Sequence, residues 1–216
     1  MPIVFWENQI KRYWQKSIFT IYFDIIRKYF IIFSYFLFCT MNQKQIVAFF
    51  AGSQDIQDEA VREKTKTEVE AFLEANKDQI SKIIYGGWVY GVMWIILEAS
   101  KKVGITIEGY SIERYRKYDE GKGVDITFFA DDYERLKEFT KNADVFVALP
   151  GWLGTIKEIL GVKDHILEGN TQKQIFVSSL FQAFYAMIQE LTQSQMIYGK
   201  DAEVLNSVWS LETIRI

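Results

Sequence analysis

The chain is poor in the two residue types that most often build metal and redox sites. Its 216 residues include one cysteine, Cys39, and one histidine, His165. A single cysteine excludes an intrachain disulfide and is typical of a reducing compartment, so we expect a cytoplasmic location. A single histidine leaves no histidine pair for a metal site, and no Gly-x-Ser-x-Gly elbow supports serine hydrolase chemistry. We expect His165 to pack within a helix or to face solvent, and we expect neither a metal nor a cofactor.

An excess of basic residues is also missing. The chain has 25 Lys and Arg against 28 Asp and Glu, which gives a net charge of −3. A protein that binds nucleic acid usually carries a basic stripe, and none is visible, so we expect no nucleic acid partner. The hydrophobic fraction of 49% is that of a soluble globular protein, and the length suits one ordinary domain.

Glycine and alanine are absent from residues 1–40, although the rest of the chain uses both freely. This segment is rich in Phe, Ile, Tyr and Lys, whose codons are AT-rich. One interpretation is therefore translated upstream DNA, with Met41 as the true start. A packed N-terminal helix is another. We expect the folded domain to span residues 41–216, preceded by an extension over residues 1–40.

A third interpretation of the same segment is a membrane-associated anchor. Ile18–Cys39 is strongly apolar, but Asp24, Arg27 and Lys28 interrupt it. Charges at the centre of a bilayer are costly. The uninterrupted apolar run, Tyr29–Cys39, is about half of the roughly 20 residues that a membrane span needs. We therefore expect membrane contact, if any, only through residues 1–40.

From Met41 onward, short apolar segments alternate with longer amphipathic ones. The apolar segments predict strands at Gln45–Ala51, Ile83–Tyr85, Ile105–Gly109, Val124–Phe129, Val145–Leu149 and Gln174–Ser178. The amphipathic segments predict helices at Asp55–Lys82, Val89–Lys102, Asp132–Lys141, Thr155–Leu167 and Phe181–Ser194. This alternation predicts an α/β three-layer sandwich with a mostly parallel, Rossmann-like sheet in a single domain.

Three glycine-bearing turns follow expected strands, at Gly52, Gly86-Gly87 and Gly151–Gly154. Open parallel sheets bind ligands beyond the carboxyl ends of their strands. In the loop Pro150–Thr155 (PGWLGT), glycine lets backbone N–H groups approach an anion at a helix N-terminus. The pattern predicts a phosphorylated ligand. It is weak by itself, because an ordinary strand-to-helix turn looks the same, and without Gly-Lys-Ser/Thr it is no Walker loop.

Four segments, in order, resemble motifs of the Lonely Guy (LOG) family. Pro150–Glu158 (PGWLGTIKE) is similar to the family's Pro-Gly-Gly-x-Gly-Thr-x-x-Glu, and Tyr85–Trp94 (YGGWVYGVMW) to its Tyr-Gly-Gly-Gly-x-x-Gly-Leu-Met-Gly. Glu134–Leu136 resembles the family's Glu-Arg-Lys helix, with the lysine missing or shifted by one position. Phe50–Ser53 stands where the family has a Gly-Ser turn. The similarity runs from about Lys44 to the end of the chain.

The resemblance implies a function and a set of site residues. Family members include phosphoribohydrolases that split cytokinin or purine nucleoside 5′-monophosphates into base and ribose 5-phosphate, and they are commonly homodimers. By this resemblance Arg135 and Glu158 form the catalytic pair. The residues implied to bind the nucleotide and its phosphate are Gly52, Ser53, Gly86, Gly87, Met93, Gly151, Trp152, Leu153, Gly154 and Thr155. A carboxylate such as Glu158 suits the oxocarbenium-like state of N-glycoside hydrolysis.

The departures from the LOG motifs share one form. Trp88, Trp94 and Trp152 stand where the family has glycine. A single base separates the glycine codon GGA from UGA. Some bacterial lineages read UGA as glycine, whereas common alternative translation tables read it as tryptophan. One interpretation is therefore that the natural protein has glycine at these positions. If the tryptophans are genuine, we expect Trp152 to crowd the phosphate and Trp94 to overpack a helix against the sheet.

Three functional hypotheses remain open at this point. The first is a hydrolase of nucleoside 5′-monophosphates of the AMP or cytokinin type. The second is a catalytically inactive nucleotide-binding or carrier protein of the same fold. The third is a membrane-tethered interaction protein that uses residues 1–40.

Overall fold

The computed structural model describes residues 44–119, 123–167, 173–194, 196, 208–209, 214 and 216. The expected N-terminal extension, residues 1–40, and the proposed start at Met41 lie outside these residues. Lys44–Ile216 forms one compact unit. Within the described residues, no helix combines the length and the apolar character that a membrane span requires.

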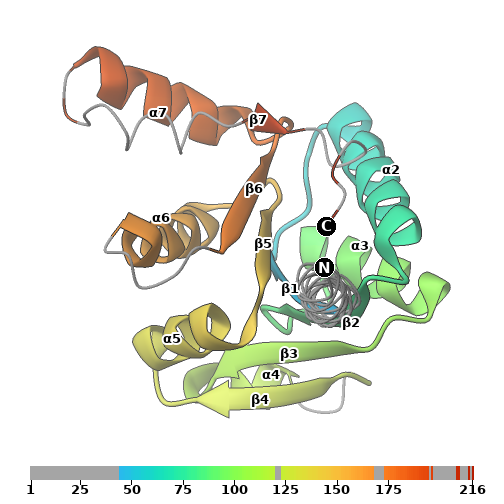
Figure 1. Cartoon of the computed structure of the whole chain (residues 1–216). Coiled ribbons are helices and arrows are strands. Elements are labelled where there is room, and N and C mark those ends of the chain that lie inside the picture. Colours follow the sequence, from blue (N-terminus) through green and yellow to red (C-terminus); the bar gives the residue numbers. More distant parts are fainter. Residues whose placement is uncertain are drawn as a thin grey trace, which may run out of the picture. The chain divides into compact units, whose positions relative to one another are not determined.

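A seven-stranded parallel sheet forms the centre of the domain (Figure 1). Its order is β4-β3-β2-β1-β5-β6-β7, and every neighbouring pair is parallel. In chain order the strands are Gln45–Phe50 (β1), Ile80–Tyr85 (β2), Ile107–Ile112 (β3), Asp125–Phe129 (β4), Val145–Ala148 (β5), Gln174–Ser178 (β6) and Val208–Trp209 (β7). The chain builds outward from β1 to β4 and then returns to the other side of β1, so the topological switch point lies between β1 and β5.

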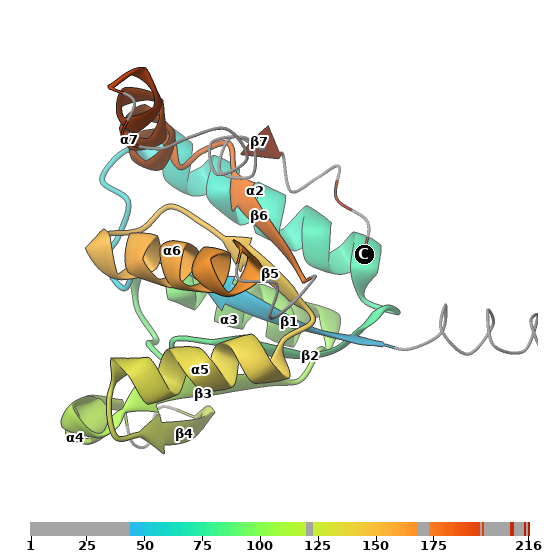
Figure 2. The same ribbon diagram turned by 60° about the vertical axis from the view of Figure 1, so that its left-hand side comes forward.

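Helices cover both faces of the sheet (Figures 1 and 2). Glu59–Asn76 (α2) and Gly91–Val103 (α3) pack on one face. Asp132–Asn142 (α5), Leu153–Leu167 (α6) and Gln182–Gln193 (α7) pack on the other. The predicted three-layer α/β sandwich with a parallel sheet is confirmed.

The alternation of side chains along β1 explains why two cores form. Val47 and Phe49 are buried against α2 and α3, whereas Ala48 and Phe50 are buried against α5, α6 and α7. Successive side chains of a strand point to opposite faces, so a strand that is apolar at every position is buried on both sides. This is the pattern of a central parallel strand.

The helix boundaries follow local capping chemistry. The Asp58 carboxylate accepts hydrogen bonds from the N–H groups of Ala60 and Val61 and starts α2. The Asp131 carboxylate accepts one from the N–H of Glu134 and starts α5, as the sequence predicts. Gly104 ends α3 in the left-handed conformation, with φ of 74°.

One predicted boundary is wrong, because the helix predicted over Asp55–Lys82 ends at Asn76. The buried Asn76 side chain donates to the carbonyls of Phe72 and Ile214 and accepts from the N–H of Ile216. It therefore ties the end of α2 to the C-terminal segment. The chain then turns into β2, where Ile80–Lys82 pairs with β1.

Two short helical segments that the sequence did not predict follow β3. They are the 3-10 turn Glu113–Tyr115 (η1) and the single-turn helix Arg116–Asp119 (α4). Both segments extend beyond the carboxyl end of β3, where a ligand of a parallel sheet is expected.

Candidate functional site

A cavity of about 240 Å³ opens at the switch point of the sheet. It is lined by Ala51, Gly52, Ser53, Trp88, Met93, Ser111, Arg114, Tyr115, Asp132, Arg135, Trp152, Gly154, Thr155 and Glu158. Eight of the predicted site residues are in this set: Gly52, Ser53, Met93, Arg135, Trp152, Gly154, Thr155 and Glu158. They come from segments up to about a hundred positions apart in the sequence, and parallel strand pairing brings them together.

Two glycine turns meet at the base of the cavity. The N–H of Gly52, after β1, donates to the carbonyl of Pro150, after β5, over 3.2 Å. A Cβ on Gly151 would come within 2.9 Å of the Gly52 nitrogen and would collide with the side chain of Thr155. Glycine is therefore required at position 151 for the two turns to approach. The first turn of α6, with the buried Thr155, begins directly after this contact.

The turns and α6 supply the chemistry of an anion site. Helix N-termini present free N–H groups and the positive end of the helix dipole. Gly154 lies in the first turn of α6, and a Cβ there would meet no atom within 4 Å. We call Gly52 and Gly151–Thr155 the cradle.

Arg135 and Glu158 form an ion pair beside the cradle. The Arg135 Nη2 donates to the Glu158 Oε1 over 2.7 Å, which joins α5 to α6. Glu158 is 7% exposed. Burial raises the pKa of Glu158, whereas the positive charge of Arg135 opposes that rise. The Arg135 Nε is also buried and makes no hydrogen bond among the described residues, so this N–H donor of the guanidinium is unsatisfied there.

Asp132 balances the charges around this pair. Its carboxylate lies 3.5 Å from the Nη2 of Arg135, 3.6 Å from the Nη2 of Arg114 and 3.4 Å from the Nζ of Lys157. Its negative charge contributes to the raised pKa of Glu158. The cavity therefore holds a chain of charged contacts that runs from Arg114 to Asp132, then to Arg135 and Glu158.

Four predicted site residues do not line the cavity. Gly86 packs directly against the Met93 side chain, since a Cβ on Gly86 would come within 2.6 Å of the Met93 Cε. Gly87, with φ of 84°, packs against Gly109. Gly151 is part of the cradle, but it faces Thr155 and Gly52 rather than the cavity. Leu153 is 80% exposed and contributes only its place at the start of α6.

The three tryptophans lie in three different environments. Trp152 is 65% exposed and lines the mouth of the cavity. The Trp88 ring meets the Tyr115 ring edge-on, with centroids 5.6 Å apart. Trp94 is 44% exposed, so the expectation that it overpacks α3 against the sheet is wrong. Position 94 lies on the outer side of the helix, where an indole has room.

Sequence reasoning missed the wall of the cavity that follows β3. Ser111, Arg114 and Tyr115 line it, as does Asp132 at the start of α5. They belong to no motif, and the only signal in the sequence was that they follow a strand. Among the described residues, no group of three or more His, Cys, Asp or Glu could hold a metal ion.

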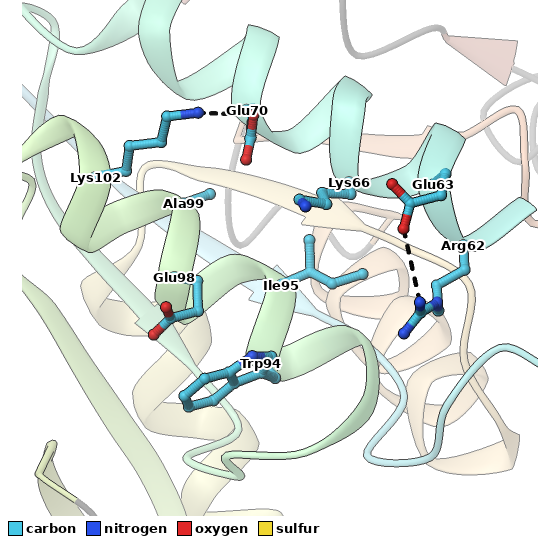
Figure 3. Close-up of a pocket in the computed structure, with 9 residues that line it drawn as sticks. All are labelled: Arg62, Glu63, Lys66, Glu70, Trp94, Ile95, Glu98, Ala99 and Lys102. Carbon is cyan, nitrogen blue, oxygen red and sulfur yellow. Dashed lines mark hydrogen bonds and ion pairs between the residues drawn. The ribbon is translucent and has the colours of Figure 1, made fainter. Parts of the chain in front are cut away.

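A larger cavity of about 410 Å³ lies between α2 and α3 (Figure 3). It is lined by Arg62, Glu63, Lys66, Glu70, Trp94, Ile95, Glu98, Ala99 and Lys102. Basic and acidic side chains are present in equal number, and several pair with one another, such as Lys102 with Glu70 over 3.0 Å. It contains none of the glycine turns and neither Arg135 nor Glu158. We therefore place the site at the switch point.

Comparison with known proteins finds a matching family and curated relatives. The model of the family described as "Possible lysine decarboxylase" matches residues 76–214. A probable cytokinin riboside 5′-monophosphate phosphoribohydrolase of Oryza sativa subsp. japonica is 29% identical over 104 residues, which are 46% of this chain and 42% of the relative. A cytokinin riboside 5′-monophosphate phosphoribohydrolase of Arabidopsis thaliana is 34% identical over 83 residues, 37% of this chain and 36% of the relative. The chain thus spans about two fifths of the length of the curated relatives it matches.

Two solved structures are similar to part of the chain. One is described as the molybdenum cofactor binding protein from the phototrophic bacterium Rippkaea orientalis, with a TM-score of 0.49 and 17% identity over 72% of this chain and 99% of that one. The other is the Moco carrier protein from Chlamydomonas reinhardtii, with a TM-score of 0.42 and 19% identity over 62% of this chain and 76% of that one.

Proposed function

We propose that this chain, which belongs to the family described as "Possible lysine decarboxylase", hydrolyses nucleoside 5′-monophosphates. Its LOG motifs predict membership of that family. The bond cleaved is the N-glycosidic bond, and the products are the free base and ribose 5-phosphate. The observation that carries the proposal is the Arg135–Glu158 ion pair, at 2.7 Å, beside the cradle. The relatives' printed activity, on cytokinin riboside 5′-monophosphates, supports a substrate of the AMP or cytokinin type.

The 5′-phosphate lies on the cradle in this proposal. Backbone N–H groups at the start of α6 and the Thr155 hydroxyl donate to its oxygens. The sugar then extends from the cradle across the Arg135–Glu158 pair. Ser53 and Met93 line the neighbouring part of the cavity. Gly86 packs behind Met93 and Gly87 against Gly109, so neither glycine contacts the ligand directly.

Glu158 acts on the anomeric carbon in this arrangement. The bond from that carbon to the base nitrogen breaks, and its electron pair leaves with the base. Ionised Glu158 stabilises the oxocarbenium-like state and orients a water molecule, whose oxygen forms the new bond to the anomeric carbon. One proton of the water stays on the new hydroxyl, and the other ends on the base nitrogen. The positive charge of Arg135 favours the ionised form of Glu158.

The descriptive name of the family refers to a different reaction, the decarboxylation of lysine. The residues that line the cavity do not fit a pyridoxal phosphate enzyme of that kind. Pyridoxal phosphate enzymes hold their cofactor as a Schiff base on a lysine. None of the described residues that line the cavity is a lysine. We therefore retain the phosphoribohydrolase proposal, and the homodimer that the LOG resemblance implies stays a prediction.

Replacement of Glu158 by glutamine tests the proposal. Glu158→Gln keeps the shape of the side chain but removes its charge, so kcat for AMP should fall at least about a hundredfold. Binding of ribose 5-phosphate should change little, because the cradle is untouched. Glu98→Gln, at an exposed glutamate of α3, is the matched control. If the unmodified chain binds AMP but never releases adenine, the chain is the inactive nucleotide-binding protein instead.

A further inference from the structure

One wall of the cavity carries groups that the phosphoribohydrolase proposal has not yet used. It consists of Trp88, which follows β2, and of Arg114 and Tyr115 in η1, which follows β3. We call these three residues the aromatic wall. Arg114 and Tyr115 belong to no LOG motif, and Trp88 stands at a motif glycine. The LOG resemblance therefore implies no role for any of the three.

The three side chains contact one another. The Trp88 and Tyr115 rings meet at 71° with centroids 5.6 Å apart. The Arg114 guanidinium carbon lies 4.8 Å from the centroid of the Tyr115 ring. Aromatic rings and arginine planes are the groups on which nucleic acid bases stack. The wall thus presents two rings and one guanidinium to the cavity.

The order of the strands places the wall away from the cradle, where the phosphate is proposed to lie. The cradle follows β1 and β5, whereas the wall follows β2 and β3. From β5 to β3 is three strand intervals, or about 14 Å. A nucleoside monophosphate that starts at the cradle and extends along the carboxyl edge of the sheet therefore brings its base to the wall.

Asp132 links the wall to the catalytic pair. Its carboxylate lies 3.6 Å from the Arg114 Nη2 and 3.5 Å from the Arg135 Nη2. Arg114 is consequently held over Tyr115 by the same carboxylate that contacts Arg135. A base at the wall and a sugar at Arg135 would then occupy one continuous cavity.

We propose that the aromatic wall is the subsite for the base, and that it takes a flat nitrogen heterocycle by stacking. This inference rests on the proposed function, because it takes the phosphate to lie on the cradle. It assigns Tyr115 and Arg114 to recognition of the leaving base, with no part in bond cleavage.

Two titrations test the base subsite separately from the phosphate subsite. Binding of AMP and of ribose 5-phosphate is measured on the full chain carrying Glu158→Gln, so that AMP is not consumed. Tyr115→Leu is then added. The Kd for AMP should rise about tenfold, because one stacking partner is lost, while the Kd for ribose 5-phosphate should stay the same. Arg114→Gln is the second variant, which keeps the test valid if Tyr115→Leu unfolds.

Tyr118→Leu is the matched control, because Tyr118 is 51% exposed, lies three positions further along and does not line the cavity. It should leave both Kd values unchanged. The base subsite is wrong if Tyr115→Leu and Arg114→Gln weaken both ligands equally, or neither. A full chain that binds both ligands and shows the AMP-selective loss, yet never releases adenine, would support the subsite and overturn only the hydrolysis. A full chain that binds neither ligand would overturn the proposed function and the subsite with it.

Discussion

Asp132 and Arg135 act on Glu158 in opposite directions. Burial and the Asp132 carboxylate raise the pKa of Glu158, and the Arg135 guanidinium lowers it. The proposed mechanism needs the ionised carboxylate, so activity should fall as the pH drops through this raised pKa. The acid limb of the activity profile should therefore lie above the pKa of an ordinary glutamate.

Asp132→Asn should shift the acid limb of the activity profile to lower pH. The substitution removes a negative charge close to Glu158, so the pKa of Glu158 falls and activity persists to lower pH. The measurement is kcat/KM for AMP across the acid range. Asp164→Asn, at an exposed aspartate further along α6, controls for a general change in charge. An acid limb that stays in place or moves to higher pH would contradict the electrostatic assignment.

Trp152 gives a second prediction for a single residue. Its indole lies close to the cradle, since a Cβ on Gly52 would be 3.7 Å from the Trp152 Cδ1. Trp152→Gly should open the cradle and raise affinity for inorganic phosphate at least about threefold, roughly 0.7 kcal/mol. Isothermal titration measures this change.

Trp94→Gly is the control for Trp152→Gly, because Trp94 does not line this cavity. It should leave phosphate affinity unchanged and cost about 0.5–1 kcal/mol of folding stability, since it places glycine within a helix. Equal or weaker phosphate binding by Trp152→Gly would show that the indole does not crowd the cradle. Mass spectrometry of the naturally produced protein decides whether positions 88, 94 and 152 are tryptophan or glycine.

The resemblance to the LOG motifs, rather than residue types alone, singled out part of the candidate site. Arg135, Glu158 and the cradle lie in ordered motifs, and all of them meet at the switch point. Arg114, Tyr115 and Asp132 could not be predicted in the same way. Arg114 and Tyr115 follow β3, and Asp132 follows β4, so they reach the cavity only because these strands extend the sheet beside β2. No local pattern in the sequence records that pairing.

At the scale of elements, the loop between β5 and α6 makes the sharpest prediction. Gly151→Ala should cost about 1–3 kcal/mol of folding stability, because its Cβ would collide with Thr155. Gly154→Ala should instead preserve or raise stability, since a Cβ there meets nothing and alanine favours a helix. Both substitutions should weaken phosphate binding, because each adds a methyl group to the cradle and keeps the phosphate further from the backbone N–H groups.

Thermal unfolding and phosphate titration separate the two variants. Gly154→Ala is the more informative, because any loss of phosphate affinity cannot be ascribed to loss of fold. If Gly154→Ala binds phosphate as tightly as the unmodified chain, the cradle has been placed wrongly.

Strands β1 to β6 and the five longer helices were predictable from periodicity, for a physical reason, whereas the two-residue strand β7 was not. β1 and β5 are buried on both faces and therefore appear as continuous apolar runs. The end of α2 was not predictable, because the buried Asn76 that ends it bonds to Ile214 and Ile216, far away in the sequence. Helix ends that depend on tertiary contacts carry no local signal.

At the scale of the whole molecule, the sequence predicts a parallel sheet but not its order. The return of the chain to β1 after β4 creates the switch point, and this is a property of the complete sheet. Local sequence favours each strand separately and does not say which strands pair.

The extent of the folding unit is a separate prediction at this scale. The first core strand starts at Gln45, and Lys44–Ile216 forms a compact unit. A chain of residues 41–216 should therefore unfold at the same temperature as the full chain, because an extension outside the core contributes little. Calorimetry of the two chains at equal concentration measures this. A large loss of stability or solubility in the shorter chain would show that residues 1–40 are part of the fold.

The most direct test of the central claim is to incubate the full chain with AMP and to quantify adenine and ribose 5-phosphate. The account predicts that both products appear in equal amounts, and that Glu158→Gln abolishes both together. Adenine without ribose 5-phosphate, release of inorganic phosphate, or unchanged turnover by Glu158→Gln would contradict it.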